Sequence, residues 1–226
     1  TSIFPYDSHS AGYLNKTHRA DLADLAQNYI HFFQPDPEVS ADPAKFYDEV
    51  IEIDLDRLEP HVVGPHTPDL ARPISQMAKD TKANDYPDDL RFALIGSCTN
   101  SSYEDIGRAA HIAAQAAKHG IKAAIPLMIT PGSETVFATI ERDGMMQSLS
   151  DIGGTVLANA CGPCIGQWKR SDIKPGEKNS IITSFNRNFP RRNDGNAETM
   201  AFIASPEIVT AFALSGSLSF NPLKDT

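Results

Sequence analysis

The sequence contains little cysteine and no long apolar run. Only three of its 226 residues are cysteines, which cannot all pair within one chain and are too sparse for a disulfide-stapled secreted domain. No apolar run approaches the roughly 20 residues that a membrane-spanning helix needs, and the first residues resemble neither a signal nor a transit peptide. We therefore expect a chain from a reducing compartment that does not enter a membrane.

Positive charge is also scarce, since 29 acidic side chains outnumber 20 basic ones and the net charge is −9. A general nucleic-acid binder depends on Lys and Arg that neutralise phosphates, so this balance argues against such a function. The excess lies in residues 1–90, which hold 17 acidic and 7 basic side chains, whereas residues 91–226 hold 12 and 13. The second part is therefore the better host for an anionic ligand.

Residues 1–59 are expected to be the C-terminal part of a preceding α/β domain. Apolar residues recur at helical spacing over 19–30, and residues 50–55 alternate apolar with acidic side chains, as a half-buried strand does. A turn-dense stretch over 60–73 then marks a domain boundary. Because the chain begins without Met and stops abruptly, we expect it to be an internal piece of a longer protein.

Residues 60–226 are expected to form a second α/β domain, in which short apolar runs alternate with helical patterns. Strands are predicted over 92–96, 125–129, 155–158 and 181–184, and helices over 103–118, from Pro131 onward, and over 208–214. This alternation predicts a mostly parallel sheet covered on both faces, which is a three-layer α/β/α architecture.

The three cysteines each follow a predicted strand. Cys98 comes soon after the strand over 92–96, and Cys161 and Cys164 come soon after the strand over 155–158. Because the carboxyl ends of parallel strands form the ligand crevice of such sheets, we expect the three sulfurs to converge. The C-x-x-C spacing of Cys161 and Cys164 places two thiolates on one ion or cluster.

Several interpretations of these cysteines remain open. A redox dithiol leaves Cys98 unexplained, and a structural zinc site needs a fourth Cys or His, which neither loop offers. Three buried core cysteines are the third alternative, although both loops are rich in Gly, Ser, Thr and Asn instead of apolar bulk. An iron-sulfur cluster with three thiolate ligands uses all three cysteines and leaves one iron able to act as a Lewis acid.

A basic loop follows the strand over 181–184. It carries Arg187 and Arg192, whose planar guanidinium groups match carboxylates bidentately and suit a di- or tricarboxylate ligand. A solvated basic loop is the alternative. Its position at the same sheet edge as the cysteines favours ligand binding.

Three motifs closely resemble those of the aconitase family. They are Gly-Ser-Cys-Thr-Asn-Ser-Ser over 96–102, Ala-Asn-Ala-Cys-Gly-Pro-Cys-Ile-Gly-Gln-Trp over 158–168, and Ser-Phe-Asn-Arg-Asn-Phe over 184–189. Further similar stretches over 1–6, 130–134 and 205–210 extend the resemblance to nearly the whole chain. The resemblance is to an internal fragment of a mitochondrial-type aconitase and implies the iron-sulfur domain of that family.

The resemblance implies a role for each matched residue. The ligands of a 4Fe-4S cluster would be Cys98, Cys161 and Cys164, and the substrate-binding residues would be Asn186, Arg187 and Arg192. It implies a hydro-lyase of the mitochondrial matrix, monomeric when full length, that interconverts citrate and isocitrate through cis-aconitate. The proton-abstracting serine of the family lies on a segment absent here, so no catalytic residue is assigned within this chain, and the fragment alone is expected to be inactive.

The remaining polar residues are given structural or solvent-facing roles. We expect loop donors and helix caps at Ser97, Ser101 and Ser102, and solvent-facing histidines at His9, His18, His31, His61 and His66.

Three related functions remain as alternatives. The mitochondrial aconitases usually have smaller residues at the positions of Pro190 and Arg191, and this departure, with Thr199 and Met200, points to a paralogue acting on homocitrate. Iron-regulatory proteins of the family bind RNA after losing the cluster, although the acidic first segment argues against this function. Isopropylmalate isomerase uses a similar cluster on a smaller acid.

Overall fold

The computed structural model describes residues 4–96 and 98–225. It divides into two compact units, a first unit over Thr1–Leu58 and a second unit over Glu59–Thr226. No helix within the described ranges is both long and apolar enough to cross a membrane.

The first unit contains short helices. They are α1 (Ser8–Lys16), α2 (Ala20–Asn28), η1 (Ile30–Phe32), α3 (Pro37–Ala41) and η2 (Pro43–Lys45). The helix predicted over 19–30 is confirmed as α2, while α1, whose start is capped by the Asp7 carboxylate, was not predicted.

The strand predicted over 50–55 is wrong. These residues form no strand, and the side chains of Ile51 and Leu55 are 76% and 77% exposed. Alternating apolar and acidic residues make a strand only where a neighbouring strand supplies hydrogen bonds and an apolar surface. The described part of the first unit contains no strand that could do so.

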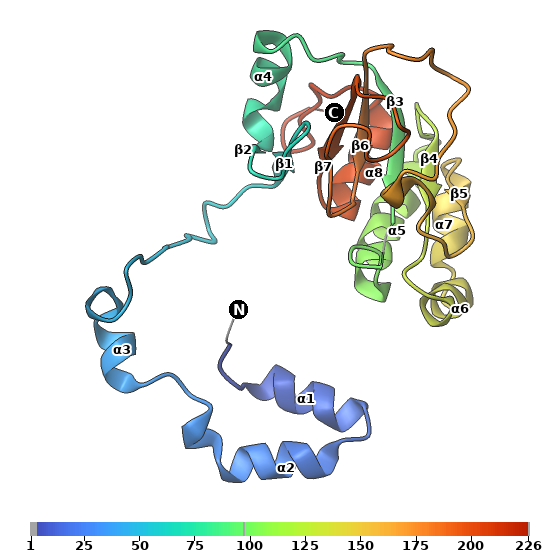
Figure 1. Ribbon diagram of the computed structural model, residues 1–226. Coiled ribbons are helices and arrows are strands. Elements are labelled where there is room, and N and C mark those ends of the chain that lie inside the picture. The colour runs from blue at the N-terminus through green and yellow to red at the C-terminus, as the bar shows by residue number, and fades with distance from the viewer. Residues whose placement is uncertain (1–3, 97, 226) are drawn as a thin grey trace. The chain divides into compact units, whose positions relative to one another are not determined.

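The second unit is built on a seven-stranded sheet in the order β2-β1-β7-β6-β3-β4-β5. The strands are β1 (His61–Val63), β2 (Ala71–Pro73), β3 (Leu90–Ile95), β4 (Leu127–Ile129), β5 (Thr155–Val156), β6 (Asn179–Thr183) and β7 (Thr199–Ile203). The five strands from β7 to β5 pair in parallel, and β1 pairs antiparallel with both β2 and β7. Figure 1 shows this order from β2 at one edge to β5 at the other. The predicted α/β class with a mostly parallel sheet is confirmed.

The helices of the second unit follow the predicted pattern in part. They are η3 (Ile74–Gln76), α4 (Met77–Ala83), α5 (Tyr103–Lys118), α6 (Glu134–Arg142), α7 (Met145–Asp151), η4 (Gly162–Ile165) and α8 (Pro206–Ser215). A capping box of Ser102 and Asp105 starts α5 as expected. In contrast, α6 begins at Glu134 and not at Pro131, because the Ser133 hydroxyl caps it by accepting from the Val136 N–H.

Side chains of the central strands alternate between two apolar clusters. Ala93 and Ile95 of β3 face the larger cluster, to which α5, α7 and α8 contribute buried residues. Leu94 faces a smaller cluster that contains Cys164 and is flanked by Trp168. The segment that carries two of the cysteines therefore packs directly on one face of the sheet.

Candidate functional site

Three loops at the carboxyl ends of strands carry the residues singled out in the sequence. The first cysteine loop (residues 96–102) follows β3, the second cysteine loop (residues 161–168) comes after β5, and the arginine loop (residues 184–196) follows β6. Because β3 and β6 are parallel neighbours, the first cysteine loop and the arginine loop begin side by side. The sheet itself thus sets where these two loops start.

Ser184 ties the beginning of the arginine loop to the first cysteine loop. Its hydroxyl oxygen accepts from the Gly96 N–H at 3.0 Å, and its carbonyl oxygen accepts from the Asn100 side-chain amide at 2.6 Å. Ser184 is fully buried, so these bonds are shielded from competing water.

Asn186 continues this connection towards Cys98. The Asn186 amide donates to the Thr99 hydroxyl at 3.4 Å, and that hydroxyl lies 3.8 Å from the Cys98 sulfur. Ser97 lies outside the described residues, whereas the predicted capping role of Ser102 is confirmed. One of the candidate substrate residues therefore adjoins a candidate cluster ligand.

The second cysteine loop is a tight turn. The Cys164 N–H donates to the Cys161 carbonyl oxygen at 2.8 Å, and Gly166 ends η4 with a left-handed φ of 84°. Cys164 is buried, whereas Cys98 and Cys161 are exposed, and all three are free thiols.

The arginine loop packs closely against this turn. A Cβ on Gly166 would lie 3.2 Å from the carbonyl oxygen of Arg192, so the missing side chain lets the two backbones approach. The buried Asn193 side chain donates to the Pro163 carbonyl oxygen at 3.1 Å. Two loops that come from different strands are thereby held together.

The pKa of the Cys164 thiol is shifted by its surroundings. Burial raises this pKa, the charge and a hydrogen bond of Arg192 lower it, and the charges of Cys161 and Cys98 raise it.

The other candidate residues of the arginine loop are more exposed. Asn186, Arg187 and Arg191 are all exposed, and the Arg187 guanidinium donates at 2.7 Å to the Asn186 carbonyl oxygen. Arg192 is partly buried, and its Nε is buried with no hydrogen-bond partner in the described structure. A buried donor of this kind is available to an anionic ligand.

The chemistry of the cysteine loops fits an iron-sulfur cluster. Cys98, Cys161 and Cys164 are free thiols, and thiolates are the usual protein ligands of such clusters. Both loops are also rich in residues that donate hydrogen bonds. Among the residues that the structure describes, no three His, Cys, Asp or Glu side chains are grouped as ligands of one metal ion.

Sequence reasoning missed a buried polar network beside the site. Arg170, just after the second cysteine loop, forms an ion pair with Asp194 of the arginine loop at 3.0 Å, and their side chains are only 2% and 1% exposed. The sequence shows only an arginine followed two positions later by Asp172, a spacing that is also common on protein surfaces. Arg170 is buried because of residues far from it in the sequence, such as Asp194.

One of the five histidine predictions is wrong. His66 is half-buried, and its Nδ1 is buried without a hydrogen-bond partner in the described part of the chain. The neighbouring Thr67 carbonyl oxygen accepts from the buried Asn188 side chain at 3.1 Å, which draws this segment onto the arginine loop.

A model of the aconitase family (aconitate hydratase) matches residues 1–216 of the chain. The chain belongs to the aconitase family. It is 56% identical over 226 residues to the mitochondrial aconitate hydratase of Schizosaccharomyces pombe and 55% identical over 225 residues to a probable mitochondrial aconitate hydratase of Dictyostelium discoideum. Each alignment covers 100% of this chain but 28% of the relative, so the chain spans under a third of their length.

A solved structure shows a weaker likeness. The chain resembles Thermococcus kodakaraensis aconitase X (holo-form) with a TM-score of 0.34 and 20% identity, over 64% of this chain and 30% of that one. The family assignment depends on the sequence matches. The relatives are named as mitochondrial proteins, which agrees with the location expected from the sequence.

Proposed function

We propose that this chain supplies the cluster ligands and the substrate-binding arginines of an aconitate hydratase, a hydro-lyase that interconverts citrate and isocitrate through cis-aconitate. Membership of the aconitase family and the names of the relatives support this function. The observation that carries it is the contact between the arginine loop and the second cysteine loop: Asn193 donates to the Pro163 carbonyl oxygen between Cys161 and Cys164, and Gly166 lets the Arg192 backbone approach.

In this proposal Cys98, Cys161 and Cys164 hold a 4Fe-4S cluster through their thiolates. When bound, such a cluster supplies a Lewis-acidic iron that has no cysteine ligand. The burial of Cys164 against the sheet fixes one ligand, and the hydrogen bonds at Ser184 fix the loop of another.

The arginine loop binds the carboxylates of the substrate. Arg192 contributes a partly buried guanidinium with a free Nε, and Arg187 contributes an exposed guanidinium next to Asn186. Planar guanidinium groups orient carboxylates bidentately, so two of them on one loop fix a tricarboxylate in a single orientation. A proton donor or acceptor is not assigned in this chain.

The remaining expectations belong to the same proposal. Residues 60–226 would be the cluster-binding α/β domain of the third-domain type, and residues 1–59 the end of a preceding domain. The complete protein would act as a monomer in the mitochondrial matrix, with a tricarboxylate as partner and without binding nucleic acid.

A substrate panel tests this function. The full-length natural protein, loaded with cluster under anaerobic conditions, should hydrate cis-aconitate and show a higher kcat/KM with citrate than with homocitrate or isopropylmalate. A preference for homocitrate would identify the paralogue instead, and turnover of none of these acids by cluster-loaded protein would contradict the proposal.

A further inference from the structure

We propose that Arg170 is a positioning residue that sets the place of Arg192 relative to the cysteines. This inference depends on the proposed function, because it concerns how that site is held. Arg170 lies two residues after the end of the second cysteine loop, and no described interaction joins it to the thiols or to Arg192. Its effect would therefore pass through the groups that it binds.

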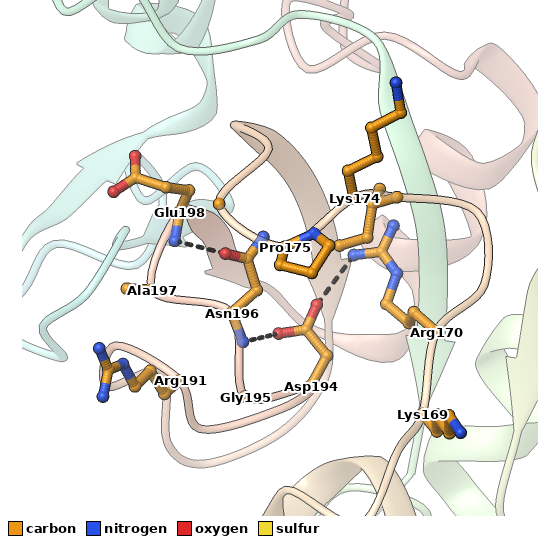
Figure 2. A pocket seen from close by; sticks show the side chains of 12 residues that line it. Lys169, Arg170, Lys174, Pro175, Arg191, Asp194, Gly195, Asn196, Ala197 and Glu198 are labelled. Carbon is orange, nitrogen blue, oxygen red and sulfur yellow. Dashed lines mark hydrogen bonds and ion pairs between the residues drawn. The ribbon is translucent and has the colours of Figure 1, made fainter.

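The Arg170 guanidinium binds groups from three separate segments. Nη1 donates to Asn179 Oδ1 of β6 at 2.7 Å and to Asp194 Oδ2 of the arginine loop at 3.0 Å. Nε and Nη2 form a bidentate pair with Asp172, at 3.0 and 2.5 Å. Figure 2 shows the Arg170 guanidinium facing the Asp194 carboxylate at the edge of a pocket between the two segments.

The same guanidinium also lies over two aromatic rings. Its central carbon lies 5.1 Å from the ring centroids of both Phe92 and Trp168, and these two rings meet edge to face at 5.0 Å. Phe92 belongs to β3 and Trp168 to the second cysteine loop. Arg170 is thus fixed between the sheet and the segment that carries Cys161 and Cys164.

Asp194 lies two residues after Arg192 and is held in place by further hydrogen bonds. Its Oδ2 also accepts from the Thr199 hydroxyl of β7 at 2.7 Å, and its Oδ1 accepts from the Asn196 N–H at 3.0 Å. Between Arg192 and Asp194 lies Asn193, which is bonded to Pro163 of the second cysteine loop. The backbone next to Arg192 is therefore held on one side by the cysteine turn and on the other by Arg170.

A lysine cannot reproduce these contacts. Its ammonium group has no planar fork, so it can satisfy only part of the Asp172, Asp194 and Asn179 set. Outer-shell partners that orient the ligands of a metal site change affinity or activity about 10- to 100-fold when they are removed, and we expect a change of similar size for the partner of a substrate-binding loop. We expect the loss to fall on substrate binding more than on cluster content.

The test uses the full-length natural protein with Arg170→Lys and Asp194→Asn, and Arg108→Gln as the matched control. Arg108 lies on α5 and forms an exposed ion pair with Glu207 at 3.9 Å, and no described interaction joins either residue to Arg170, Asp172 or Asp194. The two network variants should keep cluster content and an EPR signal within about twofold of the parent, raise the KM for citrate about 10- to 100-fold, and speed amide hydrogen exchange over residues 187–196. The control should change none of these.

Other outcomes would overturn the inference. If the variants lose cluster in proportion to activity while the loaded fraction keeps the parent's KM, Arg170 is only a structural residue. Unchanged hydrogen exchange over 187–196 in both variants would overturn it as well. If the parent itself turns over no tricarboxylate, the proposed function fails, and hydrogen exchange still decides whether Arg170 orders the arginine loop.

Discussion

The side-chain amide of Asn193 donates a hydrogen bond to the carbonyl oxygen of Pro163 at 3.1 Å. Asn193 is 2% exposed, and its partner lies between Cys161 and Cys164. This buried bond therefore joins the segment with the candidate cluster ligands to the segment with the candidate substrate arginines.

Asn193→Ala should reduce the free energy of unfolding of the second unit by about 1–3 kcal/mol, because it removes a buried hydrogen bond and leaves the Pro163 carbonyl without this donor. Urea denaturation measures this change. The control is Asn84→Ala, which removes an exposed bond of 2.9 Å to Asp80 and should cost less. An equal loss of unfolding free energy in the two variants would show that the bond between the loops stabilises the fold no more than an exposed hydrogen bond does.

The two adjacent arginines of the loop should differ in function. Arg192→Lys is expected to raise the KM for citrate of the full-length protein about 10- to 100-fold, since the partly buried guanidinium beside Cys164 loses its planar fork. Arg191→Lys, on an exposed residue with a left-handed φ of 65°, should change KM less than about twofold. A larger effect of Arg191→Lys would mean that the wrong arginine was assigned.

Gly64→Ala should be more destabilising than its conformation alone explains. Gly64 has a φ of 108°, and an added Cβ would lie 2.4 Å from Asn188 Nδ2 and 2.8 Å from the Ala201 carbonyl oxygen. Gly153→Ala is the matched control, because its φ is 95° and nothing lies within 4 Å of the added Cβ. We expect about 1–2 kcal/mol for the control and about 1–3 kcal/mol more for Gly64→Ala, measured by thermal unfolding.

The contribution of Asp172 should depend on pH. The hydrogen bonds from Arg170 lower the pKa of this carboxyl below its ordinary value of 3.8. A lowered pKa means that the carboxylate stabilises the fold above the ordinary value and that this stabilisation disappears as the pH falls through the lowered one. Asp172→Asn should therefore lower Tm at neutral pH, and the difference should shrink in acid. A Tm difference that grows on acidification would contradict the pairing; Glu141→Gln, an exposed carboxylate of α6, is the control.

The sequence predicts best those elements whose structure depends on residues close to one another in the sequence. Over 103–118 small apolar residues recur at three- and four-residue spacing between a capping box and Gly120, and α5 occupies that range. The alternation over 50–55 failed because a strand also requires a partner, and local pattern cannot supply one. The short strand β7 likewise depends on its place between β1 and β6.

The sequence predicts the residues of the candidate site only where a residue follows the carboxyl end of a predicted strand. Cys98 and Arg187 come after β3 and β6, whose parallel pairing brings their loops together. Arg170 could not be recognised in this way, because its burial depends on Asn179 and Asp194, 9 and 24 residues further along the chain. A buried ion pair consists of the same residue types as an exposed one, so the sequence alone does not distinguish them.

The most direct test of the account is the cluster itself. The chain and its Cys98→Ser variant would be reconstituted anaerobically with iron and sulfide, mildly oxidised and examined by EPR. We predict a 3Fe-4S signal in the parent that the variant loses, as expected when three thiolates hold a cubane with one labile iron. Stoichiometric zinc without any cluster in the parent, or an equal signal in the variant, would contradict the three-cysteine site.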